Sequence, residues 1–177
     1  MSIRFDDRVA IVTGAGGGIG KQHALELAKR GAKVVVNDLG GSVDGSGASD
    51  AAEEVVSQIK SDGGEAISNG ASVTDLEAVK AMVEQTMSKW GRIDILVNNA
   101  GILRDKSFHK VTIDDFNLVM DVHFQGTLNC THSVFPIMRE QEYGRIVFTS
   151  SSSGVFGNFG QTNYGSAKMA MVGLMNT

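Results

Sequence analysis

The stretch that most limits the possible folds is the glycine-rich segment TGAGGGIG (13–20), which continues directly from the apolar run VAIVTG (9–14). A glycine cluster between a strand and a helix is the usual context of a dinucleotide-binding turn. Gly14 would permit the tight turn, Gly18 the close approach of a pyrophosphate, and Gly20 the close packing of helix on strand. The N-terminus of the following helix offers N–H groups and a positive dipole end to phosphates. The segment therefore predicts a nucleotide site.

Apolar, β-branched runs alternate along the chain with segments whose apolar residues recur at helical spacing. The runs that predict strands are residues 9–14, 33–38, 66–70, 93–99 and 144–151. The segments that predict helices are residues 18–30, 48–62, 75–90 and 112–141, followed by one that begins near residue 162. Nearly continuous apolar runs suit strands buried on both faces of a parallel sheet. The alternation therefore predicts a doubly wound, Rossmann-type α/β fold.

Two smaller local signals accompany this pattern. TDLE (74–77) has the form of a capping box that opens the third helix. The small-residue segment GGSVDGSGASD (40–50) predicts a loop, potentially mobile, that leads into the second helix.

Length and composition restrict the class of protein. With 177 residues, 42% apolar and 20% charged, the chain suits a single domain, 1–177, with a sizeable core. The net charge of −4 gives no reason to expect a nucleic acid or an anionic membrane as partner. No apolar run is long enough to span a bilayer. The charged stretch MSIRFDD (1–7) is followed by no apolar h-region or cleavage site, so we expect no signal sequence. Cys130 is the only cysteine, so we expect no disulfide, no metal site and a reducing, cytoplasmic compartment.

Asp38 ends the second predicted strand, 18 residues beyond Gly20. A carboxylate at this position accepts hydrogen bonds from adenosine ribose hydroxyls and repels a 2′-phosphate. No Arg or Lys lies within the glycine segment or just beyond Asp38 to receive that phosphate. The pattern favours NAD over NADP, with an aspartate in a solvated turn as the alternative explanation.

Three motifs in the same order resemble the short-chain dehydrogenase/reductase family: TGAGGGIG (13–20), NNAG (98–101) and YGSAK (164–168). VVVNDLGG (34–41) and DVHFQG (121–126) are similar to the (3R)-hydroxyacyl-CoA dehydrogenase region of multifunctional enzyme type 2 and its bacterial single-domain relatives. The resemblance covers the whole chain. It implies an NAD-dependent oxidoreductase that interconverts a secondary alcohol and a ketone, with (3R)-hydroxyacyl-CoA and 3-ketoacyl-CoA as the expected pair.

The resemblance assigns the catalytic roles to four residues. Tyr164 would be the general acid/base and Lys168 its partner, and on a helix this i, i+4 pair shares one face. Ser151 falls at the family's serine position, although its neighbouring serines leave that register open. His123 stands where the wider family has an asparagine and the closer subgroup a histidine. Taken alone, a YxxxK pair arises by chance on many helices, and a lone helix histidine is more often structural than catalytic.

The chemistry explains why a tyrosine would need a lysine beside it. An isolated tyrosine titrates near pH 10, which is too high for an effective base at neutral pH. A nearby ammonium group favours the phenolate and lowers that pKa. Ser151 could then hydrogen-bond the substrate oxygen while the proton leaves through Tyr164.

The resemblance also assigns a set of cofactor-binding positions. They are Gly14, Gly16, Gly18, Ile19, Gly20, Asp38, Ser72, Val73, Asn99, Ala100, Gly101, Tyr164 and Lys168. Ser72 and Val73 would touch adenine, and residues 99–101 would line a ribose and the structural core. Lys168 would in addition donate to the nicotinamide ribose hydroxyls.

Two groups of residues are candidates for contact with an acyl-CoA substrate. Phe156 and Phe159 could contact an acyl chain, or they could belong to the core. Arg104, Lys106 and Lys110 could meet the phosphates of coenzyme A, although a solvated basic face explains them as well.

Family members usually continue past the Tyr–Lys helix through a substrate-covering segment and further strands. The resemblance therefore implies a truncated sheet with strand order 3-2-1-4-5 and the strand at 144–151 left at an edge. Helices 112–141 and 162–177 would form the usual contact of a homo-oligomer. Two kinds of alternative stay open: a nucleotide-binding or assembly module without turnover, and an enzyme for 3-ketoacyl carrier protein, steroids or sugar alcohols.

Overall fold

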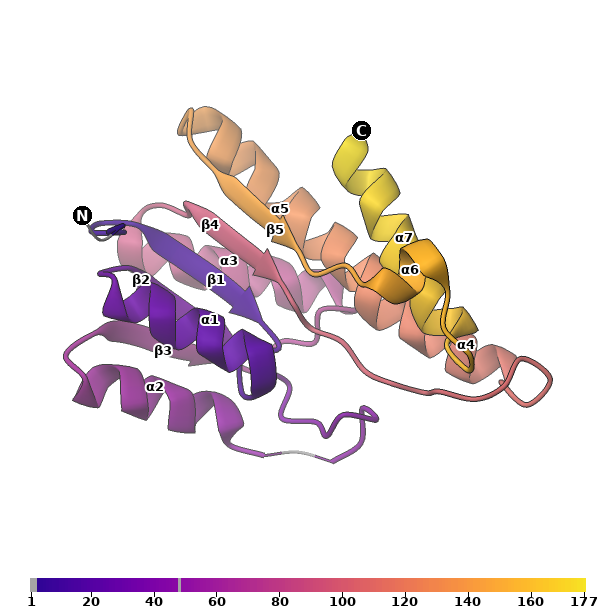
Figure 1. The fold of residues 1–177 in the computed structure, drawn as a ribbon. Helices are drawn as coiled ribbons and strands as arrows, with labels where there is room; N and C mark the ends of the chain where they lie inside the picture. The colour runs from indigo at the N-terminus through magenta and orange to yellow at the C-terminus, as the bar shows by residue number, and fades with distance from the viewer. Residues whose placement is uncertain (1–2, 48) are drawn as a thin grey trace.

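The computed structural model describes residues 3–47 and 49–177. Within these residues, five parallel strands form one sheet in the order β3-β2-β1-β4-β5 (Figure 1). The strands are β1 (Val9–Thr13), β2 (Lys33–Asn37), β3 (Glu65–Asn69), β4 (Ile95–Asn98) and β5 (Arg145–Phe148). The predicted Rossmann-type sheet and its strand order are confirmed, with β5 at an edge.

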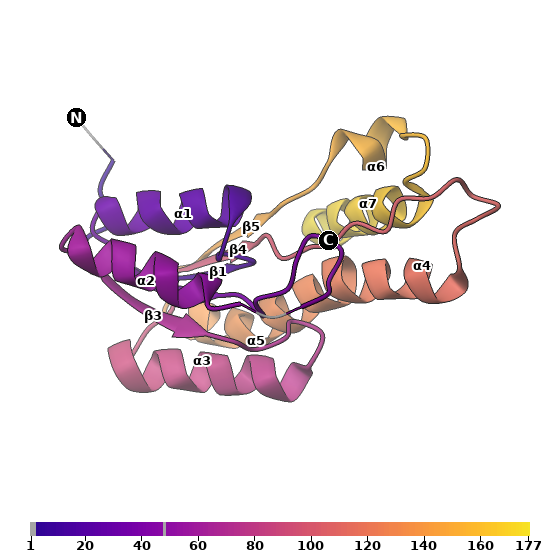
Figure 2. The ribbon, with the colours of Figure 1, turned by 90° about the horizontal axis from the view of Figure 1, so that it is seen from below.

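Helices cover both faces of the sheet. They are α1 (Gly18–Lys29), α2 (Ala51–Ser61), α3 (Leu76–Trp90), α4 (Ile113–Met120), the π turn η1 (Asp121–Gln125), α5 (Gly126–Glu140), α6 (Ser152–Phe156) and α7 (Thr162–Asn176). The core consists of two apolar clusters, one on each face of the sheet, because successive side chains of β1 point to opposite faces. Ala10 and Val12 pack with α1 and α2, whereas Ile11 packs with α3 and α5. Figure 2 shows α1 and α3 on opposite sides of the strands.

The interior strands differ from the edge strand in burial. Every residue of β1 and β4 is buried, as expected for strands with helices on both faces. Exposed and half-buried residues alternate along β5, and Val147 is 44% exposed. The core therefore lies around β1, β2 and β4.

The sheet brings the sequence motifs to one edge. Because the strands are parallel, Thr13, Asn37 and Asn98 end β1, β2 and β4 at the same side of the sheet. In Figure 1, α4, α6 and α7 gather beyond these carboxyl ends. Ligands of open α/β sheets bind outside this edge, so the glycine turn and the Tyr–Lys helix face a common region.

Several local predictions need correction. The helix expected over 112–141 is interrupted by η1, because a π turn is a local change in hydrogen bonding that 3.6-residue periodicity cannot reveal. The capping box is wrong by one residue: Asp75 caps α3 through hydrogen bonds from the N–H groups of Glu77 and Ala78, at 3.0 and 3.1 Å. The hydroxyl of Thr74 instead lies 2.8 Å from that of Ser72.

Some predicted limits also shift. Strands β1, β2, β4 and β5 are shorter than predicted by one to four residues, and β3 keeps its predicted length but begins one residue earlier. The short helix α6 lies in a region where the sequence predicted no helix. The second helix begins at Ala51, and residue 48, where it was predicted to begin, lies outside the described residues. Among the described residues, no helix combines the length and apolar character needed to cross a bilayer.

Candidate active site

The glycine turn is a tight backbone structure between β1 and α1. Gly14 and Gly18 have φ values of +62° and +51°, which favour glycine. A Cβ on Gly20 would collide with the carbonyl oxygen of Gly14 and lie 2.5 Å from Nδ2 of Asn99. The first helical turn can therefore approach β1 closely only because residue 20 has no side chain.

The N-terminus of α1 is open to solvent. Gly17 is the N-cap residue, and no described side chain caps the helix there. A Cβ on Gly17 or Gly18 would meet no atom within 4 Å, and the neighbouring Ile19 is 63% exposed although it is apolar. Exposed N–H groups at a helix N-terminus, with no acidic residue in the first turn, suit an anionic group such as a pyrophosphate.

Asn99 joins this turn to the end of β4. Its Nδ2 donates to the carbonyl oxygens of Thr13 and Gly14, each at 3.0 Å. The N–H groups of Asn99 and Ala100 both donate to Oγ1 of Thr13 at 3.0 Å. The Asn99 side chain thus holds the glycine turn in place.

Asp38 lies directly beside the glycine turn. Its Oδ2 accepts from the N–H of Gly16 and its Oδ1 from the N–H of Gly40, both at 2.8 Å. A Cβ on Gly16 would lie 2.9 Å from the carboxyl carbon of Asp38. Each carboxylate oxygen keeps a second lone pair, so the two ribose hydroxyls of an adenosine could still donate to it.

The two predicted adenine contacts differ in exposure. The side chain of Val73 is buried and packs against Gly126 of α5, and its carbonyl oxygen accepts from Nδ2 of Asn129 at 2.9 Å. Any contact of Val73 with a ligand would therefore involve its backbone. Ser72 is half-buried and shares a hydrogen bond with Thr74.

Lys168 is almost completely buried, with 3% of its surface exposed. Its Nζ donates to the carbonyl oxygen of Thr149 at 2.5 Å and lies 5.4 Å from the centre of the Tyr164 ring. Burial disfavours the ammonium form and lowers the pKa of Lys168 to about 8. The structure brings the predicted pair together on α7, with the cation over one face of the tyrosine ring.

His123 lies in the π turn η1 and completes this cluster. Its ring contacts that of Tyr164 edge to face, with centroids 5.2 Å apart and planes at 86°. The Nε2 atom lies 2.8 Å from the carbonyl oxygen of Ile102 and 3.1 Å from its N–H, and Nδ1 has no partner among the described residues. Only 2% of the residue is exposed. A Cβ on Gly101 would collide with the imidazole, so the glycine leaves room for the ring.

The environment of His123 keeps its imidazole neutral. Burial, followed by the positive charge of Lys168, lowers the pKa of His123 to about 4. The imidazole is therefore uncharged at physiological pH and can contribute one hydrogen-bond donor and one acceptor.

Three of the four neighbouring serines, Ser150, Ser151 and Ser153, differ in their side-chain hydrogen bonds. Ser151 is the N-cap of α6, and its Oγ accepts from the N–H of Ser153 at 3.2 Å. The Oγ of Ser150 donates to the carbonyl oxygen of Lys168 at 3.0 Å, and the Oγ of Ser153 to Gln161 at 2.9 Å. The Ser151 hydroxyl thus keeps its proton for another acceptor, whereas Ser150 and Ser153 are occupied as donors.

Sequence reasoning missed Asn163, which immediately precedes Tyr164. It is fully buried, its Nδ2 donates to the carbonyl oxygen of Arg104 at 3.1 Å, and its Oδ1 accepts from the N–H of Tyr164 at 2.8 Å. These bonds fix the start of α7 against the segment after β4. The only signal in the sequence was its position directly before YGSAK (164–168), and that position does not reveal that the side chain is buried.

The residues considered for acyl-CoA contact divide into two groups. Phe156 and Phe159 are 86% and 90% exposed, so the structure contradicts the alternative that they belong to the core. Arg104 and Lys106 both pair with the carboxylate of Asp115, at 3.6 and 2.7 Å. Much of the positive charge predicted after β4 is therefore balanced within the chain.

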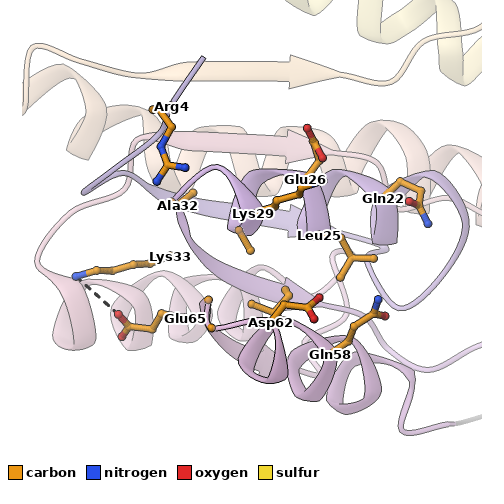
Figure 3. A pocket seen from close by; sticks show the side chains of 15 residues that line it. Arg4, Gln22, Leu25, Glu26, Lys29, Ala32, Lys33, Gln58, Asp62 and Glu65 are labelled. Carbon is orange, nitrogen blue, oxygen red and sulfur yellow. Dashed lines mark ion pairs between the residues drawn. The ribbon is translucent and has the colours of Figure 1, made fainter. Parts of the chain in front are cut away.

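A separate hollow lies away from this site. It has a volume of about 720 Å³ and lies between α1 and α2 (Figure 3). Lys33 and Glu65, which line it, begin β2 and β3, so it opens at the amino edge of the sheet. The glycine turn and the Tyr–Lys cluster lie at the opposite edge.

Comparison with known proteins places these features in a wider group. Residues 8–177 match the family model described as short chain dehydrogenase. Over 176 residues the chain is 56% identical to the peroxisomal multifunctional enzyme type 2 of Drosophila melanogaster, covering 99% of this chain and 29% of that protein. Over 178 residues it is 57% identical to the peroxisomal multifunctional enzyme A of Dictyostelium discoideum, covering 100% of this chain and 40% of that protein.

A solved structure supports the same grouping. The structure of 7α-hydroxysteroid dehydrogenase complexed with NADH and 7-oxo glycochenodeoxycholic acid matches with a TM-score of 0.87 at 34% identity. The match covers 97% of this chain and 64% of that one. The chain thus spans less than two thirds of each of these three proteins.

Proposed function

Because the chain belongs to the short-chain dehydrogenase family, we propose that it acts as an NAD-dependent oxidoreductase on (3R)-hydroxyacyl-CoA and 3-ketoacyl-CoA. One observation carries the choice of NAD: the Asp38 carboxylate is held at the rim of the glycine turn by two N–H groups. A fixed negative charge there accepts from ribose hydroxyls and opposes a 2′-phosphate.

The residues present fit a dinucleotide. Open space in front of Gly17 and Gly18 leaves room for a pyrophosphate at the uncapped N-terminus of α1. Asp38 would hold the adenosine ribose, and Lys168 the ribose next to the nicotinamide. When bound, the cofactor supplies hydride transfer, which no protein side chain can provide.

The remaining chemistry falls to this chain's own side chains. Ser151 donates its free hydroxyl proton to the substrate oxygen and so orients the reacting carbon. Tyr164 takes the alcohol proton at its phenolic oxygen, or returns it in the reverse direction. The ammonium group of Lys168, 5.4 Å from the ring centre of Tyr164, stabilises negative charge on the phenol. Because Lys168 is buried, its ammonium group is shielded from water, which strengthens its electrostatic effect on the phenol.

The substrate class rests on likeness and on one surface feature. The Drosophila and Dictyostelium relatives are multifunctional enzymes by name, and they share more than half of the aligned residues with this chain. Phe156 and Phe159 offer exposed apolar surface beside α6, which suits an acyl chain. We further propose that the chain forms a homo-oligomer through α5 and α7, where Phe135 and Met169 are 56% and 48% exposed.

The relative affinity for NADH and NADPH tests the proposed choice of NAD as cofactor. We expect NADH to bind with micromolar affinity in a fluorescence titration and NADPH to bind much more weakly. Asp38→Asn should weaken NADH binding about tenfold, the order of one hydrogen bond to a charged group, and narrow the preference for NADH. Asp62→Asn makes the same charge change beside the hollow at the other edge of the sheet and should leave both affinities unchanged. Equal affinity of the wild-type chain for both nucleotides would contradict the choice of NAD.

A turnover assay tests the proposed substrate. We expect NADH formation from (3R)-hydroxybutanoyl-CoA and none from the (3S) epimer. The likeness to 7α-hydroxysteroid dehydrogenase favours a second candidate, a steroid alcohol, which belongs in the same assay. Nucleotide binding without turnover of any substrate would instead favour a binding or assembly module.

The compartment is a separate proposal. We propose a reducing, cytoplasmic location on the basis of the single buried cysteine, Cys130. The Drosophila and Dictyostelium relatives are peroxisomal by name. Microscopy of the tagged protein in its own cells distinguishes diffuse cytoplasmic signal from organelle-bound signal.

A further inference from the structure

The loop after β2 crosses to the segment that follows β4. We call residues 40–47 the strap. The carbonyl oxygen of Val43 accepts from the N–H of Leu103 at 2.9 Å, and the carbonyl oxygen of Asp44 accepts from Nε of Arg104 at 2.8 Å. A Cβ on Gly45 would lie 3.3 Å from the side chain of Ile102. The strap therefore packs on residues 102–104, which sequence patterning did not indicate.

The first residue of the strap is hydrogen-bonded to Asp38, the carboxylate that we propose binds the adenosine ribose. Oδ1 of Asp38 accepts from the N–H of Gly40, the first strap residue, while Oδ2 accepts from Gly16 in the glycine turn. Inside the strap, the Asp44 carboxylate accepts from the hydroxyls of Ser42 and Ser46 at 2.6 and 2.7 Å. A displaced strap would thus disturb one of the two bonds that orient Asp38.

Arg104 also borders the catalytic end of the site. Its carbonyl oxygen accepts from the buried Asn163, which in turn accepts from the N–H of Tyr164. Its Nη1 lies 3.6 Å from the carboxylate of Asp115 on α4. One residue therefore touches the strap, α4 and the start of the Tyr–Lys helix.

We propose that Arg104 is a positioning residue that holds the strap against residues 102–104 and thereby sets Asp38 for the adenosine end of the nucleotide. Because the guanidinium is always charged and planar, its Nε can donate to the Asp44 carbonyl oxygen while Nη1 faces Asp115. The part of the proposal that concerns the nucleotide rests on the proposed function; the part that concerns the strap does not.

The chain offers a matched pair of variants. Arg104→Gln removes the bond to Asp44 and one positive charge beside Asp115. Lys106→Gln removes a different positive charge, since Nζ of Lys106 lies 2.7 Å from the same carboxylate of Asp115. It leaves the contact between Arg104 and the strap intact. Thermal unfolding of both variants first establishes that they are folded.

Amide hydrogen exchange, measured by NMR on the protein without nucleotide, reports directly on whether the strap stays in place. The N–H of Leu103 is bonded to the strap, whereas the N–H of Lys106 is bonded to Gly160 at 2.9 Å and serves as the internal control. We expect Arg104→Gln to speed exchange at Leu103 about tenfold, the order of one hydrogen bond from a charged donor. Exchange at residue 106 should not change, and Lys106→Gln should leave Leu103 as in the wild type. Unchanged exchange at Leu103 in Arg104→Gln would overturn the proposal.

Nucleotide titration then tests the consequence. AMP contains only the adenosine end, so we expect Arg104→Gln to weaken AMP and NADH by the same factor, about fivefold to tenfold. Saturating NADH should restore the protection of Leu103 in the variant, which a merely misfolded protein would not show. Weaker NADH binding with unchanged AMP binding would place the effect at Tyr164 and contradict the strap mechanism. If the wild-type chain bound neither nucleotide, the proposed function would fail, and the exchange result alone would decide whether Arg104 holds the strap.

Discussion

The glycine turn and the Tyr–Lys cluster share one edge of the sheet but consist of different kinds of groups. The turn consists of backbone groups and small residues, and the Asp38 carboxylate beside it is half-buried and accepts from two N–H groups. The Tyr–Lys cluster consists of polar side chains, of which Lys168 and His123 are buried, with only 3% and 2% of their surface exposed, and Tyr164 is half-buried. One region depends on the absence of side chains, and the other on the burial of large ones.

This difference determines how each region should respond to change. The turn has no spare volume at Gly20, where an added methyl group would collide with backbone that cannot move aside. A buried polar cluster responds through protonation, because burial disfavours the charged forms of Lys168 and His123. Substitutions at the turn should therefore act at all pH values, and those in the cluster should depend on pH.

The largest expected effect lies in the catalytic cluster. Tyr164→Phe removes only the phenolic oxygen and keeps the ring that contacts His123. We expect turnover to fall by about 10³-fold, since general acid–base groups contribute about 10²–10⁴. NADH affinity measured on the same sample should stay within about twofold. Turnover close to that of the wild type would assign the acid–base role to another group.

The second prediction compares two glycines of the turn. Gly20→Ala should lower the free energy of unfolding by about 3 kcal/mol, because its Cβ would collide with the Gly14 carbonyl oxygen. Gly17→Ala should change it by less than about 0.5 kcal/mol, because Gly17 has an extended φ of −154° and open space around it. Its methyl group would nevertheless face the nucleotide and weaken NADH binding. Urea unfolding of both variants provides the comparison, and equal losses would contradict the packing argument.

The third prediction concerns the acid sensitivity that His123 confers. Its pKa is about 4 in the folded chain, against 6.5 for an ordinary histidine, so only the unfolded chain takes up this proton between those values. The stability contributed by neutral His123 is complete above pH 6.5 and is lost as the pH falls towards 4. The stability difference between wild type and His123→Asn should therefore shrink by about 3 kcal/mol from pH 7 to pH 4. Parallel stability curves for the two proteins would show that folding does not lower the pKa of His123.

The smallest expected effect is at Lys168. Its pKa is lowered from 10.5 to about 8, so below pH 8 the folded chain holds a buried ammonium group at a cost. Lys168→Met removes that cost together with the bond to the Thr149 carbonyl oxygen, and should stabilise the chain by about 1 kcal/mol at pH 7. The gain should fade as the pH rises from 8 to 10.5, where the wild-type lysine becomes neutral in both states. A less stable variant at pH 7 would mean that the bond to Thr149 outweighs the burial cost.

The sequence by itself determined the order of strands and helices, the glycine turn and the pairing of Tyr164 with Lys168. These features depend on local pattern: buried runs of β-branched residues, glycines where positive φ or close approach is needed, and the i, i+4 spacing of a helix. The fold class and strand order follow because parallel strands with helical crossovers have few arrangements.

Only the tertiary structure decided the environment of those residues. The Asp75 cap and the π turn that carries His123 depend on local shifts in hydrogen bonding that the sequence pattern does not show. The burial of Asn163 depends on a hydrogen bond to a segment far away in the sequence. The same holds for the strap, whose contacts join residues 43 and 44 to residues 103 and 104. Local sequence fixes which atoms are available, but desolvation and long-range hydrogen bonds, which set their pKa and position, arise only when distant segments pack together.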